Sequence, residues 1–358
     1  MKLGMFMMPL HPPEKDRTEC FEEDIELVVH ADELGFTDVW VGQHHSAAWE
    51  PIPANDMFIA HMLPLTKNIR FGPGVVIVPH HHPVNVAVRI AYLDHLARGR
   101  LNCGFGQSGV PTDWELFDLP DPRTQGLMTL EGIDMVLKLW QAEAPFDFKG
   151  EFWRIRIENP NPEVALGPML KPYQKPHPPI AMSVVKGTSM GARTAGERGY
   201  IPVSTNVVPA ATVAQHWQTY CAGAEGADQQ DPDRSIWGVS RSIFVGESKK
   251  EAWDFAVNST FGRSWDYMIK IVKAAKLLDI MKMHPDMPDD EVTPEYVLKN
   301  ICIIGDVAEC VRQLEDLWDV TGGFGTLLMI AHDWDDKERW TQSMKLLADE
   351  VIPALPSV

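Results

Sequence analysis

The sequence predicts an α/β fold, specifically a (β/α)8 TIM barrel. Short apolar runs that suit buried strands alternate with segments of helical periodicity, and this alternation occurs eight times. Polar and ionisable residues directly follow several of the apolar runs, the position from which α/β barrels present their functional groups. The length of 358 residues also suits one barrel. We therefore expect a single barrel domain spanning residues 1–358.

Each strand and helix is predicted from its own pattern. The apolar runs predict eight strands, at residues 3–8, 36–42, 69–78, 101–106, 180–185, 200–204, 235–245 and 325–331. Helical spacing of apolar residues predicts helices at residues 21–34, 54–65, 83–98, 124–140, 188–197, 207–223, 249–278, 307–320 and 340–352. Gly35 and Gly99 are expected to end two of these helices. Pro83 is expected to open one, because a first-turn residue needs no N–H donor.

The alternation is interrupted once, after the fourth strand and its helix. Residues 145–178 are rich in proline and contain several aromatic residues. Because the strand–helix rhythm then resumes, we interpret this segment as an insertion into the barrel and not as a linker between domains.

Composition narrows the class of partner. The net charge of −18 repels phosphate backbones and anionic membrane surfaces, so we expect neither nucleic acid nor a membrane as a partner. No apolar run is long enough for a membrane span, and the N-terminus lacks the features of a signal peptide. The five cysteines contain no CxxC pair, which predicts free thiols in a reducing compartment. We therefore expect a cytoplasmic protein.

Two adjacent histidines, His44 and His45, follow the second predicted strand. On an extended backbone neighbouring side chains point to opposite faces, so one ring is expected to face a site while the other braces the loop. An imidazole at a strand end is a candidate acid–base group. The alternative is that both rings only form hydrogen bonds with the backbone.

A metal site is not expected at the histidines. Consecutive histidines such as those at residues 80–82 diverge on an extended backbone, and no HxxxH motif accompanies them. Gln43 stands where a carboxylate ligand could have been. We interpret the triple histidine as a loop-stabilising rim.

The segment after the fifth predicted strand suits a phosphate group. Residues 186–191 follow an apolar strand and open a helix, so free backbone N–H groups and the helix dipole converge there. Thr188 and Ser189 add hydroxyl groups, and Lys186 adds positive charge. An ordinary serine or threonine N-cap is the alternative.

Glycines interrupt the third predicted strand at Gly72 and Gly74. Glycine weakens a central strand unless the backbone has to approach a flat group or adopt an unusual geometry. A β-bulge is the alternative.

Taken together, these elements resemble the bacterial luciferase-like flavin monooxygenases. The resemblance extends over almost the whole chain, and the matching segments, in the family's order and spacing, are residues 1–6, 35–45, 82–83, 93–100, 105–106 and 195–199. The C-terminal segment at residues 322–334 is most similar to the limonene 1,2-monooxygenase-like branch.

The resemblance implies roles for particular residues. The family's catalytic histidine corresponds to His44, and its non-proline cis peptide beneath the isoalloxazine ring corresponds to Gly74–Val75. Its phosphate site for FMN corresponds to Thr188, Ser189 and the neighbouring amides, including that of Met190.

The chain also departs from the family at two places. Gln43 stands where bacterial luciferase has glutamate. Gly106 and Gln107 stand where it has cysteine and arginine, so the phosphate charge would fall to Lys186, Arg193 or the helix dipole.

The function that the resemblance implies is oxygenation by reduced FMN and dioxygen, through a flavin C4a-hydroperoxide, of a small apolar substrate such as a terpene or cyclic ketone. No GxGxxG motif follows the first strand, so reduced flavin would come from a separate reductase. The family commonly forms homodimers. An F420-dependent hydride-transfer oxidoreductase and a non-catalytic flavin-binding protein remain alternatives, and the choice between epoxidation and Baeyer–Villiger insertion stays open.

Overall fold

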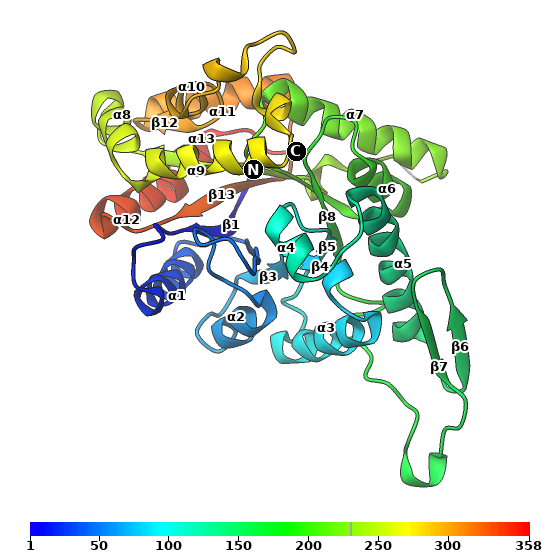
Figure 1. The fold of residues 1–358 in the computed structure, drawn as a ribbon. Helices are drawn as coiled ribbons and strands as arrows, with labels where there is room; N and C mark the ends of the chain where they lie inside the picture. The colour runs from blue at the N-terminus through cyan, green and yellow to red at the C-terminus, as the bar shows by residue number, and fades with distance from the viewer. Residues whose placement is uncertain (230) are drawn as a thin grey trace.

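The computed structural model describes residues 1–229 and 231–358. Its main sheet is a barrel seen along its axis in Figure 1, with neighbouring strands parallel in the order β3-β2-β1-β13-β10-β9-β8-β5-β4. The strands are β1 (Lys2–Leu10), β2 (Asp38–Val41), β3 (Arg70–Pro73), β4 (Val76–Ile77), β5 (Cys103–Gly106), β8 (Ile180–Val184), β9 (Ile201–Ser204), β10 (Gly238–Arg241) and β13 (Thr326–His332).

The two ends of this order meet, because β3 and β4 are halves of one strand. Phe71 in β3 bridges Leu101 just before β5, and Val76 in β4 pairs with Phe105 in β5. The halves are separated by a cis peptide bond between Gly74 and Val75, at the place that the family resemblance implies. The nine strands therefore occupy the eight predicted barrel positions.

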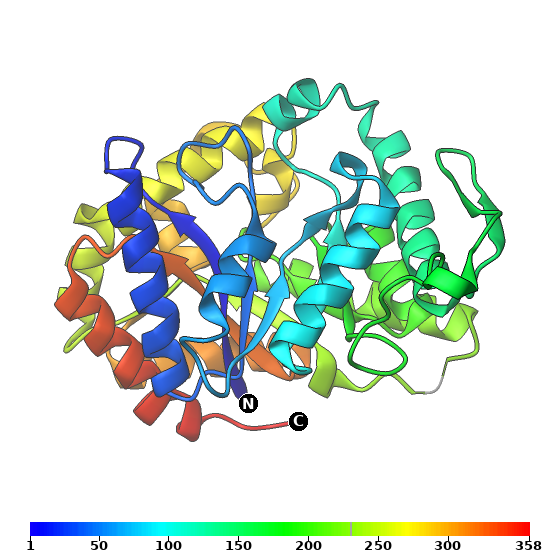
Figure 2. The same ribbon diagram turned by 90° about the horizontal axis from the view of Figure 1, so that it is seen from below.

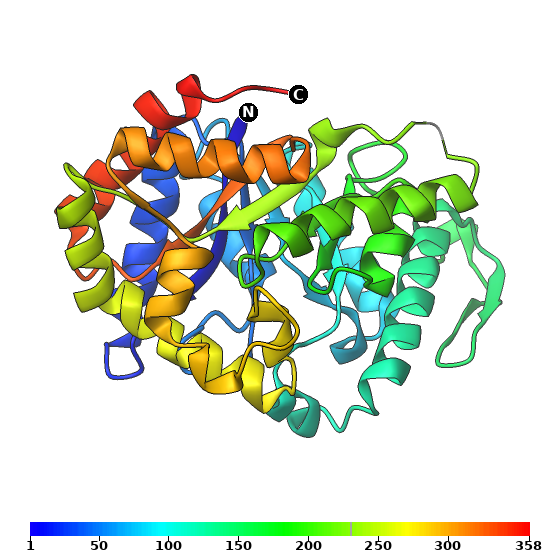
Figure 3. The same cartoon turned by 90° about the horizontal axis from the view of Figure 1, so that it is seen from above.

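Helices cover the outside of the barrel. Figure 2 shows α1, α2 and α3 on one flank, and Figure 3 shows α7 and α11 on the opposite one. The helices are α1 (Arg17–Glu33), α2 (Asn55–Met62), α3 (Pro83–Ala97), α4 (Pro111–Leu116), α5 (Pro122–Gln141), α6 (Met190–Arg198), α7 (Ala210–Gly226), α8 (Lys249–Asn258), α9 (Thr260–Ala274), α10 (Pro294–Asn300), α11 (Val307–Thr321), α12 (Lys337–Leu346) and α13 (Ile352–Ala354).

Short turns complete the assignment. They are the 3-10 turns η1 (Val78–His80), η2 (Pro162–Val164), η3 (Arg234–Ile236), η4 (Leu278–Met281) and η5 (Asp289–Glu291), and a π turn at Leu347–Val351. Gly35 and Gly99, where helix ends were predicted, have φ of +79° and +86°, a conformation that glycine adopts without strain. None of the described helices is long and apolar enough to cross a membrane.

Besides the strand divided into β3 and β4, two further predicted elements are split in the structure. The strand predicted at residues 235–245 leaves the barrel after β10, and its remainder, β11 (Ile243–Val245), pairs with β12 (Ile303–Gly305) in a separate sheet. The helix predicted at residues 249–278 is broken at Ser259, whose side chain accepts a hydrogen bond from the Phe261 N–H and caps α9. The short helices α4 and α10 were missed, since six or seven residues carry little periodicity.

The insertion at residues 145–178 begins with a hairpin of β6 (Phe146–Lys149) and β7 (Arg154–Ile157), which projects beyond α5 in Figure 1. The Glu131 carboxylate of α5 accepts hydrogen bonds from three consecutive backbone N–H groups of the hairpin turn, at 2.7–3.0 Å. Near the far end of the insertion, Gln174 donates from its backbone and its side chain to Asp94, at 2.8 and 2.7 Å. The insertion is therefore anchored to the helical layer at both ends.

The core has two parts. A large cluster fills the space between the strands and the surrounding helices. A second, smaller cluster lies within the barrel, where Trp40, Ala181, Val203 and Leu328 pack together with Phe6 and Ile201. None of these residues is the last residue of its strand, so the carboxyl ends of the strands lie beyond this apolar cluster. In Figure 2 both termini lie at one end of the barrel, and α4 and α9 lie at the other.

Candidate active site

His44 follows β2 and lies between two buried carboxylates. Its Nε2 is 3.3 Å from Glu50 Oε2, and its Nδ1 is 3.5 Å from Asp113 Oδ2. The ring is 19% exposed, whereas the carboxylates are 5% and 0% exposed. Burial alone would lower the pKa of His44, but the charge of Glu50 and hydrogen bonding with Asp113 raise it to about 10. His44 is therefore an imidazolium at neutral pH.

The ring of His45 faces aromatic partners, as the alternation of side chains predicts, and shares with His44 the Asp113 carboxylate, which lies 4.0 Å from its Nδ1. Its ring packs edge-on against Phe117 at 4.8 Å and against His80 at 5.2 Å, and His80 stacks on Phe117 at 4.0 Å. Burial lowers the pKa of His45 and lowers that of His80 to about 4, so both rings are neutral at neutral pH. Of the triple histidine, His80 belongs to this aromatic cluster. His82 accepts a hydrogen bond from the Val84 N–H at the start of α3, in keeping with a loop-stabilising role.

Asp113 and Glu50 are site residues that the sequence reasoning missed. Asp113 lies in the first turn of α4 and accepts hydrogen bonds from Ser46 Oγ at 2.5 Å and from the His45 N–H at 3.3 Å. Burial alone would raise the pKa of Asp113, but hydrogen bonds from His44 and Ser46 hold it well below its usual range. Neither carboxylate stands at a strand end. The signal that could have found Asp113 is its place in the first turn of a helix in the loop after the fourth strand.

Glycines stand at the split between β3 and β4 and at the end of β5, and Gly74, Val75 and Gly106 together are called the glycine surface. A Cβ on Gly74 would stand 3.1 Å from Trp40 Cβ, and one on Gly106 would stand 2.8 Å from Val75 Cγ2. Asn55 of α2 joins the end of β2 to this surface, because its Nδ2 donates to the carbonyl oxygens of Val41 and Val75 at 3.1 Å each. Both added Cβ atoms would meet side chains that already fill the space, so these positions require glycine and the backbone there carries no side chain of its own. A planar ring fits against such a backbone. Val75 also occupies the space that a cysteine at position 106 would need.

The predicted phosphate seat lies at the start of α6. Ser189 caps this helix, and its Oγ accepts a hydrogen bond from the Ala192 N–H at 3.1 Å, so the ordinary N-cap is present. Thr188, Lys186 and Met190 are exposed beside it. Within the described residues neither the Thr188 hydroxyl nor the Lys186 ammonium has a side-chain hydrogen bond or ion pair, so both are free to meet a ligand.

The predicted site residues follow four barrel strands that are neighbours. His44 follows β2, Gly74–Val75 separates β3 from β4, Gln107 is exposed just after β5, and the segment from Lys186 to Met190 follows β8. Because these strands are adjacent in the sheet, the residues lie along one arc at the carboxyl end of the barrel.

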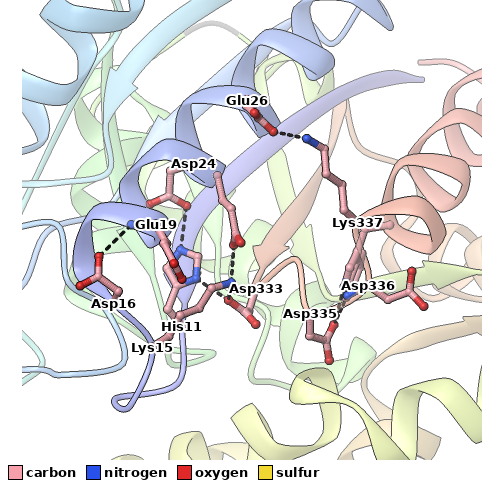
Figure 4. Close-up of polar contacts among 12 residues, drawn as sticks. His11, Lys15, Asp16, Glu19, Asp24, Glu26, Asp333, Asp335, Asp336 and Lys337 are labelled. Atoms are coloured by element: carbon pink, nitrogen blue, oxygen red, sulfur yellow. Dashed lines mark hydrogen bonds and ion pairs between the residues drawn. The ribbon is translucent and has the colours of Figure 1, made fainter.

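A separate buried network joins the ends of β1 and β13 (Figure 4). His11 Nδ1 lies 2.7 Å from Asp333 Oδ1, and its Nε2 lies 3.0 Å from Asp24 Oδ1. Burial opposes the charged ring, but the two carboxylates raise the pKa of His11 to about 9. In the described part of the chain His11, Glu23 and Asp333 have the character of metal ligands. The Lys15 ammonium lies 2.5 Å from Glu23 and 2.7 Å from Asp333, and it adds a second positive charge to that of His11.

A family model described as luciferase-like monooxygenase matches residues 1–324. The chain belongs to the luciferase-like monooxygenase family. The 4-hydroxyprotoasukamycin monooxygenase of Streptomyces nodosus subsp. asukaensis is 31% identical, over 99% of this chain and 92% of the relative. The limonene 1,2-monooxygenase of Rhodococcus erythropolis is 28% identical, over 98% of this chain and 85% of the relative.

A solved structure supports the same assignment. The oxygenating constituent of 3,6-diketocamphane monooxygenase from Pseudomonas putida, a type II Baeyer–Villiger monooxygenase in complex with FMN, is 28% identical. It has a TM-score of 0.90 to this luciferase-like chain and covers 100% of it, with 99% of its own length matched. The predicted fold class, family and monooxygenase activity are confirmed by these matches.

Proposed function

We propose that the protein is the oxygenase component of a two-component monooxygenase, which uses reduced FMN and dioxygen to oxidise a small apolar substrate such as a terpene or cyclic ketone. The observation that carries this proposal is His44, charged between Glu50 and Asp113 after β2, a strand adjacent to the glycine surface. The limonene monooxygenase and the FMN-bound oxygenating constituent support it, because both match nearly the whole chain. A separate reductase supplies the reduced flavin.

The residues present fit FMN. Gly74 and Val75 would lie against its ring system, and Gln107 after β5 would reach its edge. The phosphate would meet positive charge and free donors at the start of α6, supplied by Lys186, Thr188, Ser189 and the Met190 amide. Bound reduced flavin supplies the electrons that activate dioxygen.

His44 holds the proton that the reaction needs. Because its carboxylate partners keep it protonated at neutral pH, it can donate a proton or a charged hydrogen bond to negative charge developing on oxygen. The neutral rings of His45, His80 and Phe117 stand beside it. Their aromatic faces suit an apolar substrate.

Transfer of labelled oxygen tests the proposal. Protein mixed with chemically reduced FMN, ¹⁸O₂ and either limonene or a camphor-derived diketone should give product that carries one ¹⁸O atom. Tight binding of oxidised FMN with no product from a wider panel of terpenes and ketones would instead indicate a flavin-binding protein. Substrate turnover with F420 and without oxygen would indicate hydride transfer. Either result would contradict the proposal.

We also propose that the protein is a cytoplasmic homodimer. Its five cysteines are free thiols, which suits a reducing compartment. The flank formed by α2 and α3 exposes large apolar side chains, namely Met57, Leu65, Tyr92 and Leu96. Apolar side chains gathered on one face suit a contact between two copies. Sedimentation at micromolar concentration should give the mass of two chains.

A further inference from the structure

Helix α9 reaches the site through Glu50. The Tyr267 hydroxyl of α9 donates to Glu50 Oε1 at 3.0 Å, while Glu50 Oε2 faces His44 Nε2 at 3.3 Å. The Tyr267 ring also stacks on Trp49, with centroids 5.4 Å apart and planes 18° apart. The Glu50 carboxylate therefore connects helix α9, which follows β10 and β11 in the chain, to the His44 imidazole after β2.

The segment that carries Glu50 is held from several sides. Arg263, one turn before Tyr267 in α9, lies over the Trp49 ring at 5.3 Å. It also pairs with Glu14 in the loop after β1, with Arg263 Nη2 3.1 Å from Glu14 Oε2. The Trp49 carbonyl accepts a hydrogen bond from the His11 N–H at 2.9 Å. Glu50 is thus fixed by contacts that do not involve His44.

Glu50 has few side-chain partners besides His44. Its side chain is 5% exposed, and a buried carboxylate is costly unless a cation or several donors compensate it. Asp113, on the other face of His44, also accepts hydrogen bonds from Ser46 and from the His45 N–H. In the described chain the side-chain partners of Glu50 are the Tyr267 hydroxyl and His44.

We infer that Glu50 is a positioning residue for His44 in the monooxygenase reaction, and that Tyr267 acts through Glu50 to hold it in place. This inference rests on the proposed role of His44. Glu50 fixes the direction of the His44 ring and favours its protonated form, and the Tyr267 hydroxyl fixes the Glu50 carboxylate. Packing in α9 thereby sets the geometry of the proton donor that follows β2.

Charge supports this geometry. The titratable groups around His44 are Glu50 and His45 in its own loop, Asp113 in α4, His80 in η1 and, behind Glu50, Tyr267 in α9. Burial opposes the charged ring, and the charge of Glu50 is the strongest influence that raises the pKa of His44. Burial beside this carboxylate raises the pKa of Tyr267, so its hydroxyl remains a donor at all working pH values.

The first test measures His44 directly and needs no enzyme turnover. In protein with ¹⁵N-labelled histidine, the His44 signal is assigned by its loss in His44→Gln and titrated by NMR. Glu50→Gln should lower the pKa of His44 by about 1–3 units, the effect of removing one close opposite charge. Tyr267→Phe, which keeps the stacked ring, should lower it by less. An unchanged pKa in Glu50→Gln would overturn the inference.

A matched control separates this effect from the loss of any buried tyrosine hydroxyl. Tyr296 in α10 is also partly buried, and its hydroxyl donates to the Met281 carbonyl oxygen at 2.9 Å, away from the site. Tyr296→Phe should leave the pKa of His44 unchanged. A shift in Tyr296→Phe equal to that in Tyr267→Phe would mean that the effect is a general response to mutation and would overturn the role of Tyr267.

The second test measures coupling of oxygen to product with supplied reduced FMN. In the wild type the product yield should stay level from pH 6 to about 9. In Glu50→Gln the yield should begin to fall at a lower pH as the pH is raised, because the lowered pKa makes His44 lose its proton sooner. An identical pH profile in both proteins would overturn the inference and leave the proposed function standing. If the wild type gives no product at all, the proposed function fails, and the NMR titration still decides whether Glu50 controls His44.

Discussion

At the scale of single residues, His44 and His45 are neighbours in the chain but differ in charge. The His44 ring is positive and the His45 ring is neutral. The ring of His44 lies between the carboxylates of Glu50 and Asp113, which hold a positive charge on it. The ring of His45 packs against Phe117, and burial lowers its pKa and keeps it neutral although the Asp113 carboxylate lies 4.0 Å away. A proton donor and an apolar wall are thus placed side by side by two consecutive residues.

Replacing His44 by glutamine should lower product formation about 10²- to 10⁴-fold, the usual range for losing one acid–base group. Glutamine can still donate a hydrogen bond to Glu50, but it carries no proton to transfer. Both variants leave Glu50 and Asp113 without the positive ring, but alanine also removes the hydrogen-bond donor and should destabilise the fold more. The measurement is product and hydrogen peroxide formed per reduced FMN, and peroxide should persist or rise.

His45→Gln is the control for this prediction, because the His45 ring contacts Phe117 and His80 instead of Glu50. Its loss of product should be smaller. Equal losses in the two variants, or full and coupled activity in His44→Gln, would contradict the assignment of His44.

His332 predicts how stability depends on pH. It is buried at the end of β13 between Phe261 and Trp340, and its Nε2 lies 3.1 Å from Ser242 Oγ. Burial lowers the pKa of His332 from 6.5 to about 3. The unfolded chain therefore binds an additional proton between these values, so the free energy of unfolding should fall as the pH falls below about 6.5.

The measurement is urea unfolding across this pH range. At pH 5 the wild type should take up about one more proton on unfolding than His332→Gln does, which appears as a steeper fall of the free energy of unfolding. Equal slopes for the two proteins would show that His332 titrates normally in the folded state.

At the scale of elements, the split third strand shapes the site. Strands β3 and β4 are separated at Gly74–Val75. Val75 packs against Gly106 at the end of the neighbouring strand β5. Three further segments at adjacent strand ends supply His44, Gln107 and the start of α6. Glycine at positions 74 and 106 is therefore important for the site because it leaves room for the neighbouring side chains.

Gly106→Ala should weaken FMN binding about tenfold or more, equivalent to about 1.4 kcal/mol. The added Cβ would stand 2.8 Å from Val75 Cγ2 and displace that side chain from the surface against which the ring would lie. Quenching of FMN fluorescence measures the affinity. Gly109→Ala is the matched control, because nothing lies within 4 Å of its added Cβ.

A double variant sharpens this prediction. Val75→Ala removes the methyl group that the new Cβ would meet, so it should restore much of the affinity lost in Gly106→Ala. If Gly106→Ala binds FMN as tightly as the wild type, the glycine surface is not where the flavin binds.

At the scale of the whole molecule, the insertion at residues 145–178 leaves and re-enters a continuous barrel. The strands on either side of it, β5 and β8, are direct neighbours, and Cys103 pairs with Ile180. A cut within the insertion would therefore break the chain without removing a barrel contact. This arrangement supports the proposal that the chain folds as one domain.

Limited proteolysis tests that proposal. A single cut in the insertion should give two fragments that elute together under native conditions, bind FMN as before and separate only in denaturant. Fragments that separate and keep their own cooperative unfolding would show two domains instead. The control is a protein cleaved at Ser259, between α8 and α9. A cut at that place interrupts core contacts.

Local patterns predicted much of this fold because they depend on neighbours in the chain. The periods of apolar residues placed all eight barrel positions, and the positive φ of Gly35 and Gly99 follows from glycine alone. The interruption at Gly74–Val75 was also visible in the sequence, and its cis bond was expected from the family resemblance. The roles of Gln107, Lys186, Thr188, Ser189 and Met190 remain predictions.

The sequence by itself determined the barrel, its family and the histidine pair after the second strand. Only the tertiary structure decided that His44 is charged and that Glu50, Asp113 and Tyr267 surround it. These partners come from a loop, from α4 and from α9, and no local period joins them to His44. The charge of an imidazole depends on burial and on distances to other charges, and folding alone brings those groups within a few ångströms.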